Sequence, residues 1–189
     1  MAAERLKGAP VRWTKFMWAG AAALLLVPFV AMRFTSEINW GPMDFVVIGA
    51  MLAALCGIVE LAVRHSANRP YRWAMALSAI GGFLVIWANL AVGIVGSEDN
   101  QFNALFFGII LVAIIASALV RLRPTAMAAT MALTAAALLG ALALGQMLGS
   151  DELWDTRPAE WVGVGLFAGI FLVAASLFRS AGDGSGEGG

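Results

Sequence analysis

The sequence predicts an all-α, polytopic membrane protein, a single bundle of six transmembrane helices with both termini in the cytoplasm. Three observations support this fold class: a strongly apolar composition, six apolar runs of spanning length, and an uneven distribution of charge among the turns between them. The 189 residues are 61% apolar and 13% charged, with a mean hydropathy of +0.84. Soluble domains average about 45–50% apolar and about 25% charged residues. One small core could not bury so much apolar surface.

Apolar runs of about 17–25 residues can cross a hydrocarbon layer roughly 30 Å thick when they are helical. Six such runs follow one another, at approximately 16–32, 44–63, 73–95, 102–120, 125–148 and 159–178. None of them shows the period-two alternation of a half-buried strand. We therefore expect helices, because a backbone in lipid has to satisfy its own hydrogen bonds.

Prolines mark the beginnings of three of these helices. Pro42, Pro124 and Pro158 stand at or just before the second, fifth and sixth runs, where a missing backbone N–H costs nothing. Pro28 differs, because it lies within the first run. We expect it to kink that helix, which neighbouring helices in a bilayer tolerate.

Basic residues gather at one set of turns and acidic residues at the other. The basic set is Arg5, Lys7, Arg12, Lys15, Arg64, Arg69, Arg72, Arg121, Arg123 and Arg179. The opposite set of turns has only Arg33 and Arg157 as basic residues, beside Glu37, Asp44, Glu98, Asp99, Asp151, Glu152, Asp155 and Glu160. The positive-inside rule makes the arginine-rich side cytoplasmic, so that both termini lie inside.

The two ends of the chain need separate interpretation. Four basic residues before the first run could belong to a secretory signal peptide, but the run is long for one and no clear cleavage site follows it. We expect that helix to stay in the protein. Residues 1–179 then form one transmembrane domain, and the Gly/Ser-rich residues 180–189 form a flexible cytoplasmic tail.

Small residues form stripes on three of the expected helices. Ser78, Gly82, Asn89, Gly93 and Gly96 share one face of the third helix. The fifth helix repeats the pattern with Thr130, Thr134, Ala137, Ala141 and Gly145, and the sixth with Gly165 and Gly169. Such faces let helix backbones approach closely in lipid.

Two polar residues inside the expected spans are candidates for function. An ionisable group within a membrane helix costs about 2.5–3.5 kcal/mol at mid-depth, so Glu60 is informative. Pairing with Arg64, one helical turn later, explains it structurally, and proton or cation handling is the alternative. Asn89 either hydrogen-bonds across a helix contact or lines a transport path.

The connection after the third helix concentrates oxygen ligands. Glu98, Asp99, Asn100 and Asn103, together with Asp44, could form an outer rim that attracts cations. Alternatively these side chains are solvated, and Asp99 or Asn100 caps the fourth helix. The connection lacks the spacing of a calcium-binding loop.

The sequence predicts no enzyme, no metal site and no cofactor. His65 is the single histidine, so a bis-histidine haem or a histidine-based zinc site cannot be built. Cys56 is the single cysteine and should be an inert packing residue. The formal net charge of zero gives no indication of nucleic-acid binding.

The stretch from Asn89 to Asn100, which ends in Gly-Ser-Glu-Asp-Asn, and the following Asn103 resemble uncharacterised small polytopic inner-membrane proteins of proteobacteria. The resemblance covers roughly the second to fourth helices. It implies a bacterial inner membrane, which fits the composition rich in alanine and in arginine over lysine. It implies nothing about activity.

Two classes of function follow from these observations. In the first, the chain is a structural or accessory membrane protein that packs through small-residue faces against another membrane subunit or itself. In the second, it is a small transporter or channel-like protein, with Glu60, Asn89 and the outer rim lining a path for a cation or proton. The first is favoured, because no expected helix carries paired buried charges or a broken midplane segment.

Overall fold

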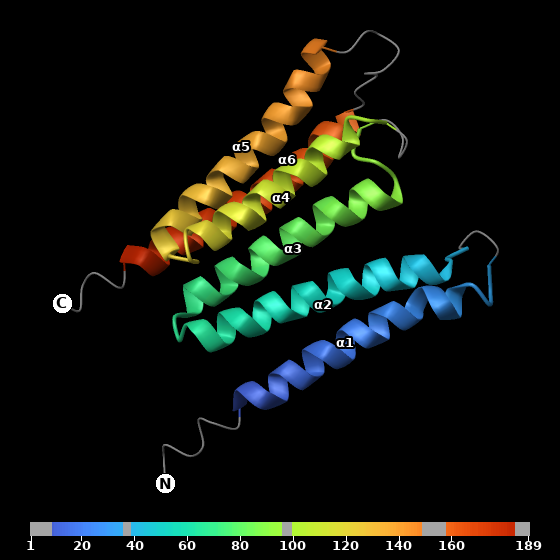
Figure 1. Ribbon diagram of the computed structural model, residues 1–189, viewed down its shortest axis with the longest axis horizontal. Coiled ribbons are helices and arrows are strands. Elements are labelled where there is room, and N and C mark those ends of the chain that lie inside the picture. The colour runs from blue at the N-terminus through green and yellow to red at the C-terminus, as the bar shows by residue number, and fades with distance from the viewer. Residues whose placement is uncertain (1–8, 36–38, 96–99, 149–157, 184–189) are drawn as a thin grey trace. The chain divides into compact units, whose positions relative to one another are not determined.

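The computed structural model describes residues 9–35, 39–95, 100–148 and 158–183 (Figure 1). In these ranges every regular element is an α-helix. The six helices are α1 (Ala9–Ala31), α2 (Pro42–His65), α3 (Arg69–Ala91), α4 (Asn103–Leu119), α5 (Pro124–Leu148) and α6 (Pro158–Asp183). The all-α class and the order of the elements are as the sequence predicts.

Five of the six helices are long and apolar enough to cross a membrane. The exception is α4, which is apolar throughout but has 17 residues. Three helices extend well beyond the expected bounds at a polar end, since α1 begins at Ala9, α3 begins at Arg69 and α6 continues to Asp183. Residues 180–183, expected in the tail, are therefore helical. Pro28 lies inside α1, and the helix ends three residues later.

The third helix has the expected length of 23 residues but begins and ends four residues earlier than the sequence predicts. It ends at Ala91 rather than near Val95, because Gly93 adopts a left-handed backbone with a φ of 73°. A glycine in this conformation just past the last turn is a common helix stop. Gly93 consequently lies beyond α3, and the expected small-residue stripe stops at Asn89 within the helix. Gly96 lies outside the described residues.

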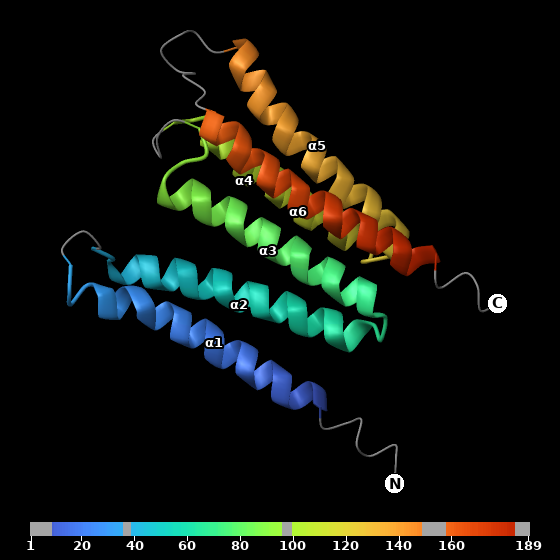
Figure 2. The ribbon, with the colours of Figure 1, turned by 180° about the vertical axis from the view of Figure 1, so that it is seen from behind.

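The chain divides after His65 into two compact units, where the sequence predicts one domain. The first unit contains the hairpin of α1 and α2, which run antiparallel (Figure 2). Aromatic rings pack at its turn: Phe45 makes edge-to-face contacts with Phe29 and Trp40, at centroid distances of 6.3 and 5.4 Å. Such contacts each add roughly 0.5–1.5 kcal/mol beyond area burial.

The second unit is a four-helix arrangement in which α3 contacts α4 and α6, and α5 contacts the same two helices. Its core consists of large side chains with almost no exposed surface, namely Val85, Phe106, Leu138, Leu142, Val164, Phe171 and Phe178. Thr130 and Thr134 are buried in α5, and their hydroxyls donate to the carbonyls of Ala126 and Thr130 at 3.0 and 2.9 Å. These two polar side chains thus need no partner from another helix.

Gly81 of α3 lies where this helix approaches α6 closely. A Cβ atom added there would lie 3.1 Å from side-chain atoms of both Ile170 and Phe171 on α6. At Gly82, the residue of the expected stripe, the nearest such atom belongs to Ile110 at an ordinary 3.8 Å. The close approach of α3 to α6 therefore depends on Gly81, which is adjacent in sequence to the expected Gly82.

We expect Gly81→Val to destabilise the four-helix unit by about 1–3 kcal/mol, because the added carbons meet a filled core. Thermal unfolding in detergent measures the change, and Gly82→Ala serves as the control with little effect. An unchanged melting temperature for Gly81→Val would show that α3 and α6 do not pack as described.

Candidate functional site

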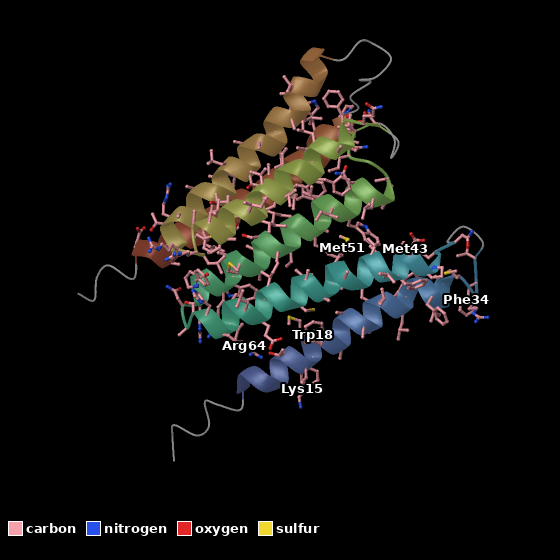
Figure 3. The ribbon with its side chains drawn as sticks, in the orientation of Figure 1. Lys15, Trp18, Phe34, Met43, Met51 and Arg64 are labelled. Carbon is pink, nitrogen blue, oxygen red and sulfur yellow. The ribbon has the colours of Figure 1, made fainter. Side chains whose placement is uncertain are left out.

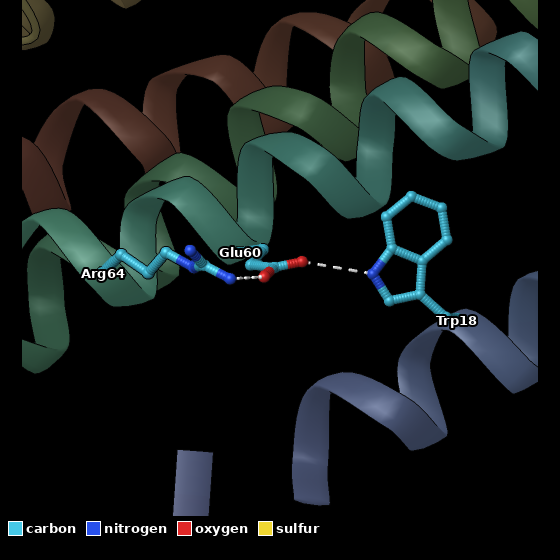
Figure 4. Close-up of polar contacts among 3 residues, drawn as sticks. All are labelled: Trp18, Glu60 and Arg64. Carbon is cyan, nitrogen blue, oxygen red and sulfur yellow. Dashed lines mark hydrogen bonds and ion pairs between the residues drawn. The ribbon is translucent and has the colours of Figure 1, made fainter. Parts of the chain in front are cut away.

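Glu60 of α2 is held between two hydrogen-bond donors (Figure 4). Nε1 of Trp18, on α1, donates to Glu60 Oε2 at 3.2 Å, and Arg64 forms an ion pair with Glu60 Oε1. The Glu60 side chain is 23% exposed and that of Arg64 is 75% exposed. The expected pairing with Arg64 is confirmed. Since both carboxylate oxygens have partners, the pair and the indole account for the acid without a transported ion.

Sequence reasoning missed Trp18 as a partner of Glu60. The two residues are 42 positions apart, and their contact depends on the register between α1 and α2 (Figure 3). A tryptophan near the end of an apolar run is usually assigned to the membrane interface, where one end of its ring stays polar. The position of Trp18 near the end of the run was thus visible in the sequence, but its contact with Glu60 could not be found without the geometry of the α1–α2 hairpin.

Asn89 and Asn103 are both buried in the second unit, with 3% and 4% of their surface exposed. Asn89, near the end of α3, donates from Nδ2 to the backbone carbonyl of Asn103 at 3.0 Å. This bond joins α3 to the first residue of α4. The expectation that Asn89 hydrogen-bonds across a helix contact is confirmed by it.

Asn103 is the centre of this contact. Its Oδ1 accepts from the backbone amides of Ile94 and Val95, each at 3.0 Å, and its Nδ2 donates to the carbonyl of Val95 at 3.4 Å. The Asn103 side chain therefore supplies hydrogen-bond partners to backbone groups of Ile94 and Val95, which have no helical partners because α3 ends at Ala91. The sequence assigns Asn103 to an outer cation-attracting rim, but its burial and these bonds to the backbone make it a structural clamp.

The amide oxygen of Asn89 is different, since Oδ1 is buried and accepts no hydrogen bond from the described residues. A single neutral oxygen is a poor cation site, because Ca²⁺ takes six to eight oxygen ligands and Mg²⁺ requires six. In the described part of the chain, no group of three or more His, Cys, Asp or Glu side chains could hold a metal. The geometry around Asn89 supports helix registration.

The two other described residues of the expected outer rim, Asp44 and Asn100, each accept a hydrogen bond from backbone close in sequence. Asp44 accepts from the backbone amide of Gly41 at 2.7 Å and so caps the start of α2. Asn100 Oδ1 accepts from the amide of Phe102 at 3.0 Å in the turn before α4. It does not cap α4, whose N-cap Phe102 has no side-chain cap. Glu98 and Asp99 lie outside the described residues.

A second polar cluster lies at the opposite end of the four-helix unit, and the sequence did not indicate it. The hydroxyl of Tyr71, at the start of α3, donates to the carbonyl of Leu122 at 3.1 Å. Asn68 donates from Nδ2 to the carbonyl of Ala181 at 3.3 Å. The single tyrosine of the chain, placed among arginines after Asn68-Arg69-Pro70, was the available signal.

We expect Asn103→Ala to destabilise the four-helix unit by about 1–3 kcal/mol or more, because it leaves the buried amides of Ile94 and Val95 without an acceptor. Asn89→Ala should cost less, since it removes one donor to a single carbonyl. Thermal unfolding of both variants in the same detergent compares them. The reverse order would contradict the assignment of Asn103 as the clamp.

No match to this chain was found among models of protein families, curated proteins or solved structures. What is established about the chain is therefore its own architecture: a helical protein whose helices fit a multi-pass membrane protein.

Proposed function

We propose that this chain is a six-pass protein of a bacterial inner membrane, with both termini cytoplasmic. We propose further that it serves as a structural or accessory subunit and associates through the small-residue face of α6 with another membrane subunit or a second copy. The single observation that supports this most is the pair Gly165 and Gly169. A Cβ atom added at either glycine would meet nothing within 4 Å.

A six-pass topology requires that α4, the shortest helix, also crosses the membrane. Its 17 residues extend about 26 Å at 1.5 Å per residue, close to the roughly 30 Å of a hydrocarbon layer. Hydrogen-bonded turns lengthen it at both ends, since Asn103 N donates to Asn100 O at 3.0 Å and Arg121 N to Ala118 O at 3.0 Å. Leu111, Val112 and Ile114 of α4 are 57–64% exposed, which suits contact with lipid.

The association face follows from the packing of α6. Its buried side includes Val164, Ala168 and Phe171, which face the core of the four-helix unit. Gly165 and Gly169 stand beside exposed Leu166, and among the described residues no side chain fills the space above either glycine. A Gly-x-x-x-Gly pair on an apolar span allows close approach of a second transmembrane helix.

The polar residues support an accessory role over transport. Glu60 is engaged by Trp18 and Arg64, and Asn103 by the backbone of residues 94 and 95. Transport sites in membranes typically combine paired intramembrane charges with broken helices near the midplane. In the described ranges α2, α5 and α6 each run unbroken through their spans.

The proposed orientation rests on the arginine-rich turns, and the bacterial inner membrane rests on the resemblance of the Asn89–Asn100 stretch and on the composition. Reporter fusions placed at Asn68 and Asn100 test the orientation. We expect the Asn68 fusion to report the cytoplasm and the Asn100 fusion the opposite side. Both fusions reporting the same compartment would contradict a crossing by α3 and with it the six-pass topology.

The association face is tested by Gly165→Leu combined with Gly169→Leu. We expect this variant to keep the melting temperature of the unaltered chain, because the space around both glycines is open within the protein. It should lose at least about tenfold in association, measured by crosslinking in membranes or by energy transfer between labelled chains. A close approach of two helices is blocked by two large side chains.

Gly108→Leu on α4 provides the matched control, since a Cβ atom added there also meets nothing within 4 Å. It adds a similar side chain to the surface of a different helix and should leave association unchanged. Equal loss in both variants would show a general effect of added bulk, and unchanged association in the α6 variant would refute the proposed face.

A further inference from the structure

Five arginines occupy the end of the four-helix unit at which α3 begins, α4 turns into α5, and α6 ends. Figures 1 and 2 show these three segments at the same end of the unit. We call the set the arginine rim, and it consists of Arg69, Arg72, Arg121, Arg123 and Arg179. Arg72 is half-buried and the other four are exposed.

Tyr71 brings the segments of the rim together. It lies between Arg69 and Arg72, and its hydroxyl donates to the carbonyl of Leu122 at 3.1 Å. Leu122 is itself flanked by Arg121 and Arg123. The Tyr71 ring also makes an edge-to-face contact with Phe178, at a centroid distance of 5.5 Å. Phe178 directly precedes Arg179. The buried Tyr71 side chain therefore contacts a residue adjacent to Arg121 and Arg123 and a residue adjacent to Arg179.

Further contacts tie α6 to the rest of the rim. Asn68 Nδ2 donates to the carbonyl of Ala181 at 3.3 Å. Gly182 approaches α5 so closely that an added Cβ atom would lie 2.9 Å from Thr125 Oγ1. The three arginine-bearing segments are therefore positioned by the fold before any ligand binds.

The turn between α4 and α5 has an unusual backbone conformation at Arg121 and Leu122. Arg121 and Leu122 have φ values of 53° and 56°, in the left-handed region that side chains other than glycine rarely adopt. The amide of Leu122 donates to Ser117 O at 3.2 Å, and its carbonyl accepts from Tyr71. Such strained residues persist only where surrounding contacts fix them, and they are common at ligand clamps.

The rim has a strong excess of positive charge. The carboxylate described at this end is Asp183, at the last residue of α6. In the described ranges Arg69, Arg121, Arg123 and Arg179 form no ion pair with a carboxylate. A planar guanidinium presents a fork of N–H donors that matches a phosphate group.

Apolar surface adjoins the rim on the outside of the bundle. Trp73 is 65% exposed one residue after Arg72, and Leu119 is 77% exposed two residues before Arg121. An exposed indole beside arginines is typical of the headgroup level of a bilayer. A ligand that combines a phosphate with acyl chains satisfies both features, whereas a free phosphate would leave the apolar surface unused.

From these contacts we infer that the arginine rim binds the phosphate headgroups of anionic phospholipids. The inference goes beyond an accessory role and holds whichever side of the membrane this end faces. It predicts binding of a defined lipid class at a site that the Tyr71 contacts organise, rather than diffuse attraction to a charged surface.

The test measures lipid retained by the full chain in neutral detergent, using native mass spectrometry with added phosphatidylglycerol or phosphatidylcholine. We expect phosphatidylglycerol to be retained at least about 30-fold better, since each arginine near an anionic headgroup contributes about a fivefold change in affinity. The double variant Arg121→Ala/Arg123→Ala should lose about 20- to 30-fold, since each basic residue near an anionic surface contributes about a fivefold change in affinity. Retention of phosphatidylcholine should not change.

The matched control is Lys15→Ala/Arg33→Ala, which removes the same two charges from exposed residues of the α1–α2 hairpin. It should retain phosphatidylglycerol as the unaltered chain does. Tyr71→Phe tests the organisation of the rim, because it keeps the ring and all arginines but removes the bond to Leu122. We expect about a threefold loss of phosphatidylglycerol with only a small fall in melting temperature, because one hydrogen bond is removed while the ring packing stays.

Four results would contradict the inference. Equal retention of the two lipids would show no headgroup preference. Equal losses in the rim variant and the control would reduce the effect to net charge. Inorganic phosphate that displaces phosphatidylglycerol at matched concentration would show that the ligand is a free anion. Full retention by Tyr71→Phe would remove its positioning role.

Discussion

The structure depends on one constraint: polar groups among apolar helices need partners from the protein itself. Where α3 stops, the side chain of Asn103 bonds the backbone of residues 94 and 95 and closes the connection. Thr130 and Thr134 bond to the preceding turn of their own helix. At the other end of the same unit, Tyr71 and Asn68 bond carbonyls at the α4–α5 turn and the end of α6. Each end of the four-helix unit is thus closed by a few side chains that reach the backbone.

Much of the fold could be predicted because the length of an apolar run and the placement of proline act locally. Pro42, Pro124 and Pro158 begin the second, fifth and sixth helices as expected. The pairing of Glu60 with Arg64 was equally accessible, since both residues lie on one helix at a spacing of four. These features require no knowledge of how separate helices pack.

The features that were missed all depend on contacts between segments distant in sequence. Gly93 could have been recognised as a helix stop, but its left-handed conformation is stabilised by Asn103, ten residues later. The partner of Glu60 on α1 and the partners of Tyr71 follow from helix register. Gly81 rather than Gly82 faces α6 for the same reason. The sequence of one helix shows which of its faces carries small or polar residues. Which residue of that face contacts a neighbouring helix depends on how the two helices pack together.

The hairpin of α1 and α2 has a consequence for biogenesis. Trp18, Glu60 and Arg64 all belong to the first 65 residues, so every described partner of the acid has been synthesised before α3 emerges from the ribosome. A nascent chain of that length can neutralise the Glu60 carboxylate, which lies away from the ends of the second span, while it leaves the insertion machinery. The Trp18 contact would then act at the moment of integration, when an unshielded charge is most costly.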